Sequence, residues 1–228
     1  MFLKKNTLKL RRLYGCLCFF ILGCNERQLR NIQLNVNDSL QAIKKVASIN
    51  VQLGLLKKTI KDADVITRTG NDFTSQSLKE LNRKDKTFSH CGIAQIDHDG
   101  LFVYHALGGE WNPDQKLKRE SFELFASPVD NNAVGIFRLA LLPHMQARLS
   151  KTVKDYYNSH LTFDMDFNLK TDDKMYCAEF IYKSFLVATD SAVQFNHSFI
   201  KDFEFIGVDD ITMHPSSKKI AVLNYKLY

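Results

Sequence analysis

The sequence has few of the residues that hold metal ions or disulfides. Of its five cysteines, only Cys91 and Cys177 come after residue 24, and no CxxC pair follows that point. A structural zinc site is therefore not expected. The two cysteines could form one disulfide, or serve as one core thiol and one reactive thiol.

A calcium site is not expected either. The stretch "DMDFNLKTDDKM" has carboxylates at alternate positions, but Leu169 stands where a calcium loop needs glycine and Met175 where it needs glutamate. The histidines at positions 98, 144, 160, 197 and 214 do not lie at ligand spacing from one another. We therefore expect no metal and no cofactor.

The start of the sequence lacks an apolar run long enough to span a membrane. A positive segment, "MFLKKNTLKLRR", precedes the 11 apolar residues "LYGCLCFFILG", whereas a spanning helix needs roughly 20. A charged start and a short apolar core are typical of a secretory signal. The run ends at Gly23 and Cys24, which resembles a bacterial lipobox, although Ile21 and Leu22 depart from the usual residues. We expect a signal peptide over 1–23 and a lipidated Cys24.

This interpretation places the chain in the bacterial cell envelope. The lipid on Cys24 would anchor it to a membrane on the periplasmic or outer-membrane side, and the sequence does not identify the leaflet. The alternatives are an uncleaved anchor or a buried N-terminal helix. Residues 24–60 are predicted to be a helical spacer, and they could equally cover a binding groove.

A large excess of one charge is also missing once the leader is set aside. The formal net charge is +6, but five of the basic residues lie in 1–23, which leaves 26 basic against 25 acidic residues. A domain with a net charge of about +1 is not drawn to phosphate backbones, although a local basic patch is compatible with this balance. We expect no nucleic-acid partner.

The rest of the chain alternates strands and helices. Strands are predicted at "ADVITRTG", "FSHCGIAQI", "LFVYHAL" and "AVGIFRLAL", and two β-prone runs, "FEFIGV" and "KIAVLNY", close the chain. The turn signal "DHDG" joins the second and third strands as a hairpin. A short helix is predicted at "DFTSQSLKELNRK", and longer ones from Pro143 to Tyr157 and from Cys177 to Ala188. Residues 61–228 therefore indicate one α+β domain with a mostly antiparallel sheet.

Cys177 stands at the predicted start of a helix. A helix N-terminus stabilises a thiolate through its free N–H groups and its dipole. Phe180, Ile181 and Phe185 lie on one face of that helix, which would dock on the sheet. The alternative is a small, buried and inert thiol.

His90 is the candidate base, since imidazole exchanges protons near neutral pH. Strand alternation puts His90, Gly92 and Ala94 on one face and Cys91 on the other. The small residues beside His90 would let the Cys177 helix approach that face, so we expect Cys177 as its partner and Cys91 in the core.

A third group should orient the second nitrogen of His90. His105, on the next strand of the hairpin, is the first candidate, and Asp164 and Glu110 follow. His105 could instead be an ordinary strand histidine, and Asp164 could cap a turn or steady the loop before Cys177.

The order of several motifs resembles a known family. "ADVITRTGNDFTSQSLKE", "FSHCGIA", "VYHA", "TFDMDF" and "MYCAEFIYKSF" follow one another as in the YaeF/YiiX group. Those proteins are circularly permuted papain-like cysteine hydrolases, relatives of NlpC-type peptidases and of lecithin:retinol acyltransferase-like enzymes. The resemblance covers roughly residues 62–225 and implies a sheet packed against the nucleophile helix. It implies Cys177 as nucleophile and His90 as base, with substrate-binding roles for Asp164 and Tyr176.

The motifs also depart from the family pattern. Ala63 stands where the family often has glycine, Phe163 replaces tyrosine, and Ala178 replaces serine. His105 stands where YiiX-like members often carry glutamate, while the acyltransferase-like relatives use a second histidine. The resemblance implies hydrolysis of amide or ester bonds in small peptides, cell-wall peptides or lipid-like molecules. A non-enzymatic peptide- or lipid-binding module and an acyltransferase are the alternatives, and the oligomeric state is not indicated.

Overall fold

The computed structural model describes residues 36–109 and 112–225, which fall into two units divided between Ser48 and Ile49. Residues 36–48 of the first unit are helical. The second unit begins with helical residues 49–57, of which Ile49 and Leu53 are buried. The predicted leader over 1–23 and the lipidated Cys24 lie outside the described residues.

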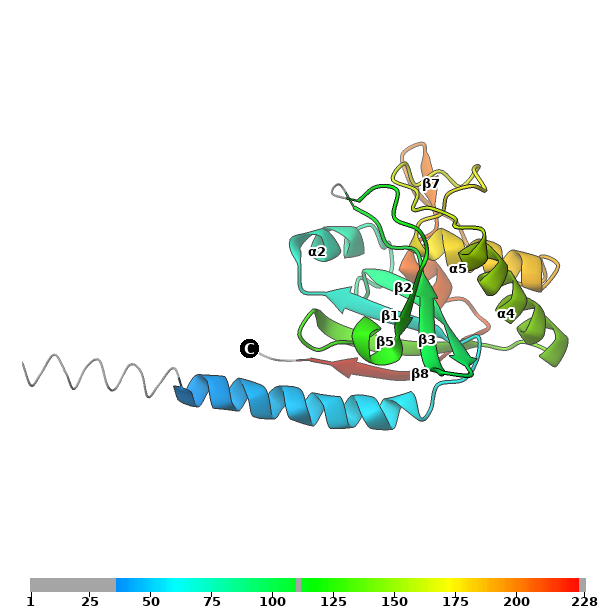
Figure 1. Ribbon diagram of the computed structural model, residues 1–228. Helices are drawn as coiled ribbons and strands as arrows, with labels where there is room; N and C mark the ends of the chain where they lie inside the picture. Colours follow the sequence, from blue (N-terminus) through cyan, green and yellow to red (C-terminus); the bar gives the residue numbers. More distant parts are fainter. Residues whose placement is uncertain (1–35, 110–111, 226–228) are drawn as a thin grey trace, which may run out of the picture. The chain divides into compact units, whose positions relative to one another are not determined.

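A six-stranded sheet forms the centre of the second unit (Figure 1). Its strand order is β4-β3-β2-β1-β5-β8, and every pair is antiparallel. The strands are β1 (Val65–Gly70), β2 (His90–Asp97), β3 (Gly100–His105), β4 (Lys118–Ser121), β5 (Asn131–Leu139) and β8 (Ser217–Asn224).

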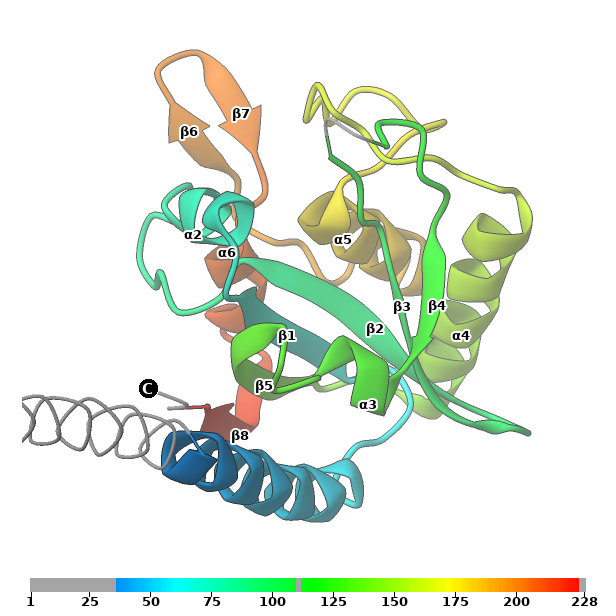
Figure 2. The ribbon, with the colours of Figure 1, turned by 60° about the vertical axis from the view of Figure 1, so that its left-hand side comes forward.

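The helices of the second unit cover this sheet and connect its strands. They are α2 (Phe73–Lys79), α3 (Phe122–Phe125), α4 (Pro143–Asn158), α5 (Cys177–Ala188) and α6 (Val208–Thr212). The small hairpin of β6 (Ser198–Ile200) and β7 (Phe203–Phe205) extends away from the six-stranded sheet (Figure 2). The predicted run "FEFIGV" is thus the short strand β7, followed by Gly207 as the N-cap of α6 and Val208 as its first residue.

Two apolar clusters lie on opposite faces of the sheet. Alternation along β2 sends Ile93 into one cluster with Phe180 and Phe185 of α5, and Ala94 into the other with Phe122 and Phe125 of α3. Burying each of the Ile and Phe side chains contributes about 1.5–3 kcal/mol. The sheet is therefore held between α4 and α5 on one face and α3 with residues 49–57 on the other.

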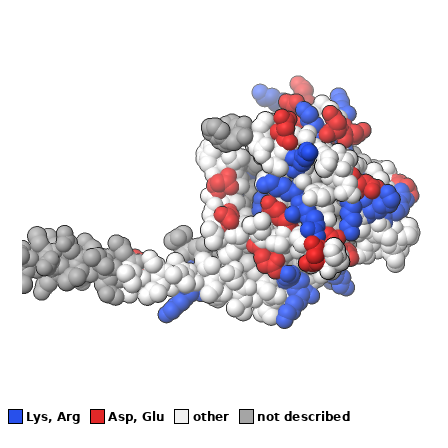
Figure 3. All heavy atoms as spheres, in the orientation of Figure 1, with Lys and Arg blue, Asp and Glu red and all other residues white. Residues whose placement is uncertain are grey.

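Acidic and basic side chains are interspersed on the surface. On the face shown in Figure 3, the described Lys and Arg residues lie among Asp and Glu residues, with no broad area of one sign. This distribution agrees with the balanced charge of residues 24–228. Among the described residues, no helix is long and apolar enough to cross a membrane.

Candidate functional site

The thiol of Cys177 lies at the first residue of α5, as predicted. Tyr176 is the N-cap, with extended backbone dihedrals. The carboxylate of Glu179 accepts the Tyr176 N–H at 3.2 Å, a common way for a helix start to satisfy a free donor. The other free N–H groups of the first turn remain available to an anion at Cys177.

Hydrogen bonds around Cys177 favour its thiolate. The thiol of Cys91 donates to the Cys177 sulfur and lowers the pKa of Cys177, burial opposes this effect, and the backbone N–H groups of Cys91, Ala178 and Cys177 add to it. Burial raises the pKa of Cys91 well above its usual value. Cys91 is thus a buried donor to the candidate nucleophile, and both cysteines are free thiols.

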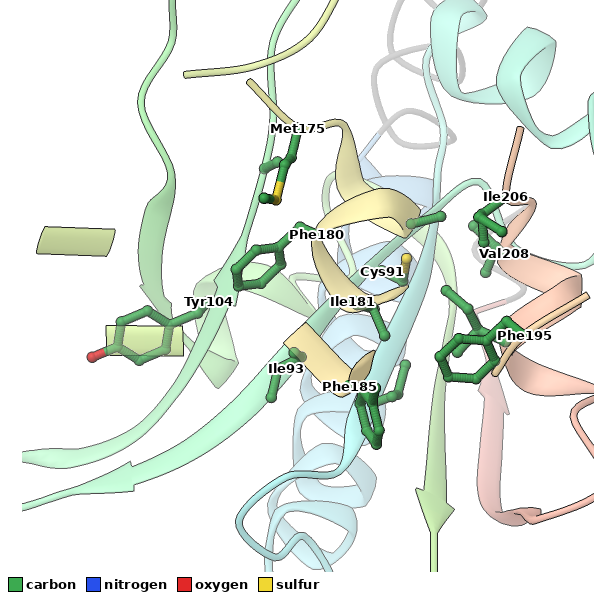
Figure 4. Close-up of a cluster of buried hydrophobic side chains, with 14 of the residues drawn as sticks. Cys91, Ile93, Tyr104, Met175, Phe180, Ile181, Phe185, Phe195, Ile206 and Val208 are labelled. Atoms are coloured by element: carbon green, nitrogen blue, oxygen red, sulfur yellow. The ribbon is translucent and has the colours of Figure 1, made fainter. Parts of the chain in front are cut away.

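This contact corrects the predicted docking face of α5. The helix packs on the face of β2 that carries Cys91, and Figure 4 shows Cys91 beneath α5 with Ile181 and Phe185. The expectation that Gly92 and Ala94 make room for this helix is wrong. Large apolar side chains of α5 need an apolar surface, which the Cys91 face supplies.

Gly92 makes room for His105 instead. A Cβ atom at position 92 would lie 2.6 Å from Val103 Cγ1, 2.7 Å from the Tyr104 carbonyl oxygen and 2.9 Å from His105 Cβ. Each of these distances is far below ordinary van der Waals contact. The glycine of "SHCG" therefore lets β3 bring its histidine beside His90.

The two histidines meet on the face of the sheet opposite α5. His90 Nε2 lies 2.8 Å from His105 Nδ1, and the ring planes are 82° apart. Phe125 packs against both rings, with centroids 5.8 Å from His90 and 5.0 Å from His105. The side chain predicted to orient His90 is in place, and its catalytic role stays a prediction.

Glu120 and Arg68 complete this cluster, and neither was predicted. Glu120 Oε2 lies 3.2 Å from His105 Nε2, although the N–H direction is not ideal for a hydrogen bond. Arg68 Nη1 lies 3.9 Å from the same oxygen and 3.1 Å from the Phe125 carbonyl oxygen, to which it donates. Glu120 belongs to β4, which is absent from the predicted strands because "KLKRES" has the composition of a solvated loop.

Burial keeps both imidazoles neutral. It lowers the pKa of His90 well below its usual value, and the charge of Arg68 adds to this effect. Burial also lowers the pKa of His105 to about 4, although Glu120 opposes it. The adjacent His105 ring lowers the pKa of Glu120 to about 2. At neutral pH the cluster therefore holds two neutral rings and one carboxylate.

Cys177 and His90 open onto the same cavity. This cavity encloses about 520 Å³ of space, part of it open solvent. Within the described residues, no hydrogen bond joins the Cys177 sulfur to His90. Hydrogen bonds of this kind are often long before substrate binds. The lining is mostly apolar and includes Leu78, Leu81, Leu107, Phe163, Phe167, Phe205, Ile206 and Val208.

Tyr176 and Asp164 take different positions relative to this cavity. Tyr176 lines it, and its hydroxyl accepts the Ile206 N–H at 2.7 Å. Asp164 is buried outside the lining, and its carboxylate accepts the N–H groups of Asp166 at 2.9 Å and Asn168 at 2.6 Å. This placement fits the turn-capping alternative for Asp164, so its substrate-binding role stays a prediction. Glu110 lies outside the described residues.

The first family motif stabilises the fold away from the cavity. Asp64 is buried, and its carboxylate oxygens lie 2.6 Å from Arg138 Nε and 2.7 Å from Arg138 Nη2. Ala63 has a φ of 70°, a conformation that favours glycine. A glycine would adopt this backbone conformation at position 63 without strain.

No family model matches the chain, and no curated protein matches its sequence. Among solved structures, the chain is similar to the metalloprotein yiiX from Escherichia coli O157:H7, with 17% identity and a TM-score of 0.58. The match covers 71% of this chain and 96% of that one. The chain therefore has a YiiX-like fold. The predicted fold class is confirmed: an α+β, permuted papain-like arrangement with an antiparallel sheet packed against the Cys177 helix.

Proposed function

We propose that this chain is a cysteine hydrolase that cleaves amide or ester bonds, with Cys177 as nucleophile and His90 as base. One observation carries the proposal: a thiol with a lowered pKa stands at the first residue of a helix and opens onto a cavity that a neutral histidine also lines. Nucleophile and base in one cleft are the minimum that acyl transfer requires.

The reaction follows from these two groups. The Cys177 sulfur attacks the substrate carbonyl carbon, and the thiol proton passes to His90. Backbone N–H groups of the first turn of α5 stabilise the oxyanion. His90 then returns the proton to the departing amine or alcohol, which leaves a thioester on Cys177. Water, deprotonated by His90, attacks the thioester and releases the acid and the free thiol.

The cavity indicates the kind of substrate. Among the described residues, its lining includes no Asp, Glu, Lys or Arg side chain and is mainly Leu, Phe, Ile and Val. Desolvating a charged group there would be costly. The group held beside the scissile bond is therefore apolar, as in a peptide with a large apolar side chain or in a lipid-like acyl compound. Cell-wall peptides remain candidates where the part that enters the cavity is apolar.

The envelope location is part of the same proposal. A signal peptide over 1–23 and a lipid on Cys24 would hold the hydrolase domain at a bacterial membrane. Mass spectrometry of the mature full-length protein tests this: cleavage before Cys24 and a diacyl modification are expected. An unmodified N-terminus that still carries residues 1–23 would contradict it.

A metal centre does not fit the described residues. The similar protein is a metalloprotein, but within 36–109 and 112–225 no three His, Cys, Asp or Glu side chains are grouped to hold a metal ion. The proposed reaction therefore has no metal-dependent step.

Hydrolysis of p-nitrophenyl esters with acyl chains of increasing length tests the activity. Wild-type, full-length protein should release nitrophenol and form a transient acyl-Cys177 that mass spectrometry detects. Cys177→Ala should lower the rate by at least roughly 1,000-fold with an unchanged circular dichroism spectrum. His90→Ala, which removes the proposed base, should also slow hydrolysis. His98→Ala is its matched control, because the His98 side chain is 95% exposed. Equal rates for wild type and Cys177→Ala would remove Cys177 from the mechanism.

A non-enzymatic binding module is the second candidate. The apolar lining favours it, as does the lack of a Cys177–His90 hydrogen bond among the described residues. Binding of a fluorescent fatty acid by wild type and Cys177→Ala alike, with no ester cleaved by either, would support this function. Transfer of the acyl group to an added amine or alcohol would instead indicate an acyltransferase.

A further inference from the structure

The chain of polar contacts at His90 continues past His105 to a carboxylate. Glu120 Oε2 lies 3.2 Å from His105 Nε2, and His105 Nδ1 lies 2.8 Å from His90 Nε2. His105 is fully buried, and its Nε2 has no hydrogen-bond partner among the described residues, so the Glu120 carboxylate is the polar group that it faces. In a neutral imidazole, one nitrogen carries the proton and the other has a free lone pair. The partners of His105 therefore bear on which nitrogen of His90 is free to act as the base of the proposed hydrolase.

Glu120 determines which nitrogen of His105 carries the proton. An ionised carboxylate only accepts hydrogen bonds. A lone pair on His105 Nε2 would face the carboxylate oxygen at 3.2 Å and repel it, whereas an N–H there is attracted. His105 therefore carries its proton on Nε2 and presents the lone pair of Nδ1.

His105 in turn determines the tautomer of His90. Its Nδ1 lone pair accepts a hydrogen bond from His90 Nε2 at 2.8 Å, so the single proton of neutral His90 is on Nε2. The lone pair of His90 is then on Nδ1. Because Nδ1 is the nitrogen not used by His105, it is the one free to take the thiol proton.

We propose that Glu120 is a positioning residue that acts through His105 to hold His90 as the Nε2–H tautomer, with Nδ1 as the base for Cys177. The inference rests on the proposed hydrolase function. It assigns a role to an edge-strand carboxylate that is not among the described residues lining the cavity.

The charges around Glu120 suit a positioning role. Arg68 Nη1 of β1 lies 3.9 Å from Oε2, and Lys118 Nζ of β4 lies 3.6 Å from Oε1. Phe125 of α3 covers both imidazoles. The two cations keep Glu120 ionised and reduce its pull on a proton, so Glu120 orients the rings and does not itself become protonated.

Nitrogen NMR of the histidine-labelled, full-length protein tests the tautomers without any substrate. Long-range proton–nitrogen spectra distinguish the two tautomers of a neutral ring, and His→Gln variants assign the signals. In wild type, His90 and His105 should both carry the proton on Nε2. Glu120→Leu should give His105 a mixture of tautomers, and Glu120→Gln should lie between, because its amide oxygen still accepts a hydrogen bond.

Kinetics of the same variants test the catalytic consequence. Glu120→Leu should lower kcat by on the order of 100-fold with little change in KM, and Glu120→Gln should lose less. Glu123→Gln is the matched control. Its carboxylate lies three residues along the chain, is 60% exposed and pairs with Lys57, so kcat and both tautomers should stay as in wild type.

The two proposals fail in different ways. Cys177-dependent hydrolysis with His90 protonated on Nδ1 in wild type would overturn the role of Glu120 and leave the hydrolase intact. An unchanged kcat in Glu120→Leu would do the same. The expected tautomers with no hydrolysis by wild type would overturn the hydrolase and, with it, the positioning role. If Glu120→Leu does not fold, the wild-type and Glu120→Gln spectra decide.

Discussion

The two faces of β2 carry out different tasks at the same end of the sheet. On one face, Cys91 lies under α5 among Phe and Ile side chains and donates to the Cys177 thiol. On the other, His90 joins His105 and Glu120 in a polar chain covered by Phe125. The thiol is positioned by apolar docking of a helix, and the imidazole by side-chain partners on neighbouring strands.

The two faces also differ in what shifts the pKa of the candidate catalytic group. Hydrogen-bond donors lower the pKa of Cys177 on one face, whereas burial and the charge of Arg68 lower the pKa of His90 on the other. A neutral His90 does not stabilise the thiolate as an imidazolium would. In the proposed reaction the Cys177 thiol is therefore activated by N–H and S–H donors, and His90 takes up the proton during the attack.

Of the three variants, Gly92→Ala should have the largest effect on stability. It should disturb only the face of β2 that carries His90. The new Cβ would clash with the Tyr104 backbone and with His105, so we expect a loss of about 2 kcal/mol in the free energy of unfolding and a broken His90–His105 contact. Urea unfolding and nitrogen NMR measure the two effects. Gly54→Ala is the control, since a Cβ there meets nothing within 4 Å; equal stability losses in both variants would contradict the account of Gly92.

Arg68→Gln should alter the pH profile of the proposed hydrolysis. Arg68 lowers the pKa of His90, and His90 can act as the proposed base only as a neutral ring. The acidic limb of the wild-type profile should therefore lie below the ordinary histidine pKa of about 6.5. Without the cation the pKa of His90 rises, and the acidic limb should move to higher pH. The measurement is kcat/KM from pH 4 to pH 8. An acidic limb that stays in place would show that burial alone sets the acidity of His90.

Cys91→Ala should have the smallest effect and disturb only the other face. It removes the S–H donor that lowers the pKa of Cys177, so the pH at which Cys177 becomes reactive should rise. Cys91→Ser keeps a donor in nearly the same place and should retain the low pKa. The rate of iodoacetamide labelling at Cys177, followed by peptide mass spectrometry against pH, separates the two. Identical curves for both variants would mean that the backbone N–H groups suffice.

Several parts of the fold were predictable because they depend on local patterns. Apolar residues at helical spacing marked α5 and its start at Cys177, and period-two alternation separated His90 from Cys91. The hairpin signal placed His105 beside His90. Docking of α5 on the Cys91 face was not predictable, because it depends on apolar surfaces that distant segments bring together.

The sequence by itself therefore determined the candidate nucleophile, the candidate base and the strand that carries each ring. Only the tertiary structure decided that Cys91 contacts Cys177 and that Arg68 and Glu120 join the histidines. The physical reason is the distance along the sequence between the residues that interact. Helix starts and strand alternation follow from neighbours a few residues apart, whereas Glu120 reaches His105 only because β4 adds to the edge of the sheet and pairs with β3.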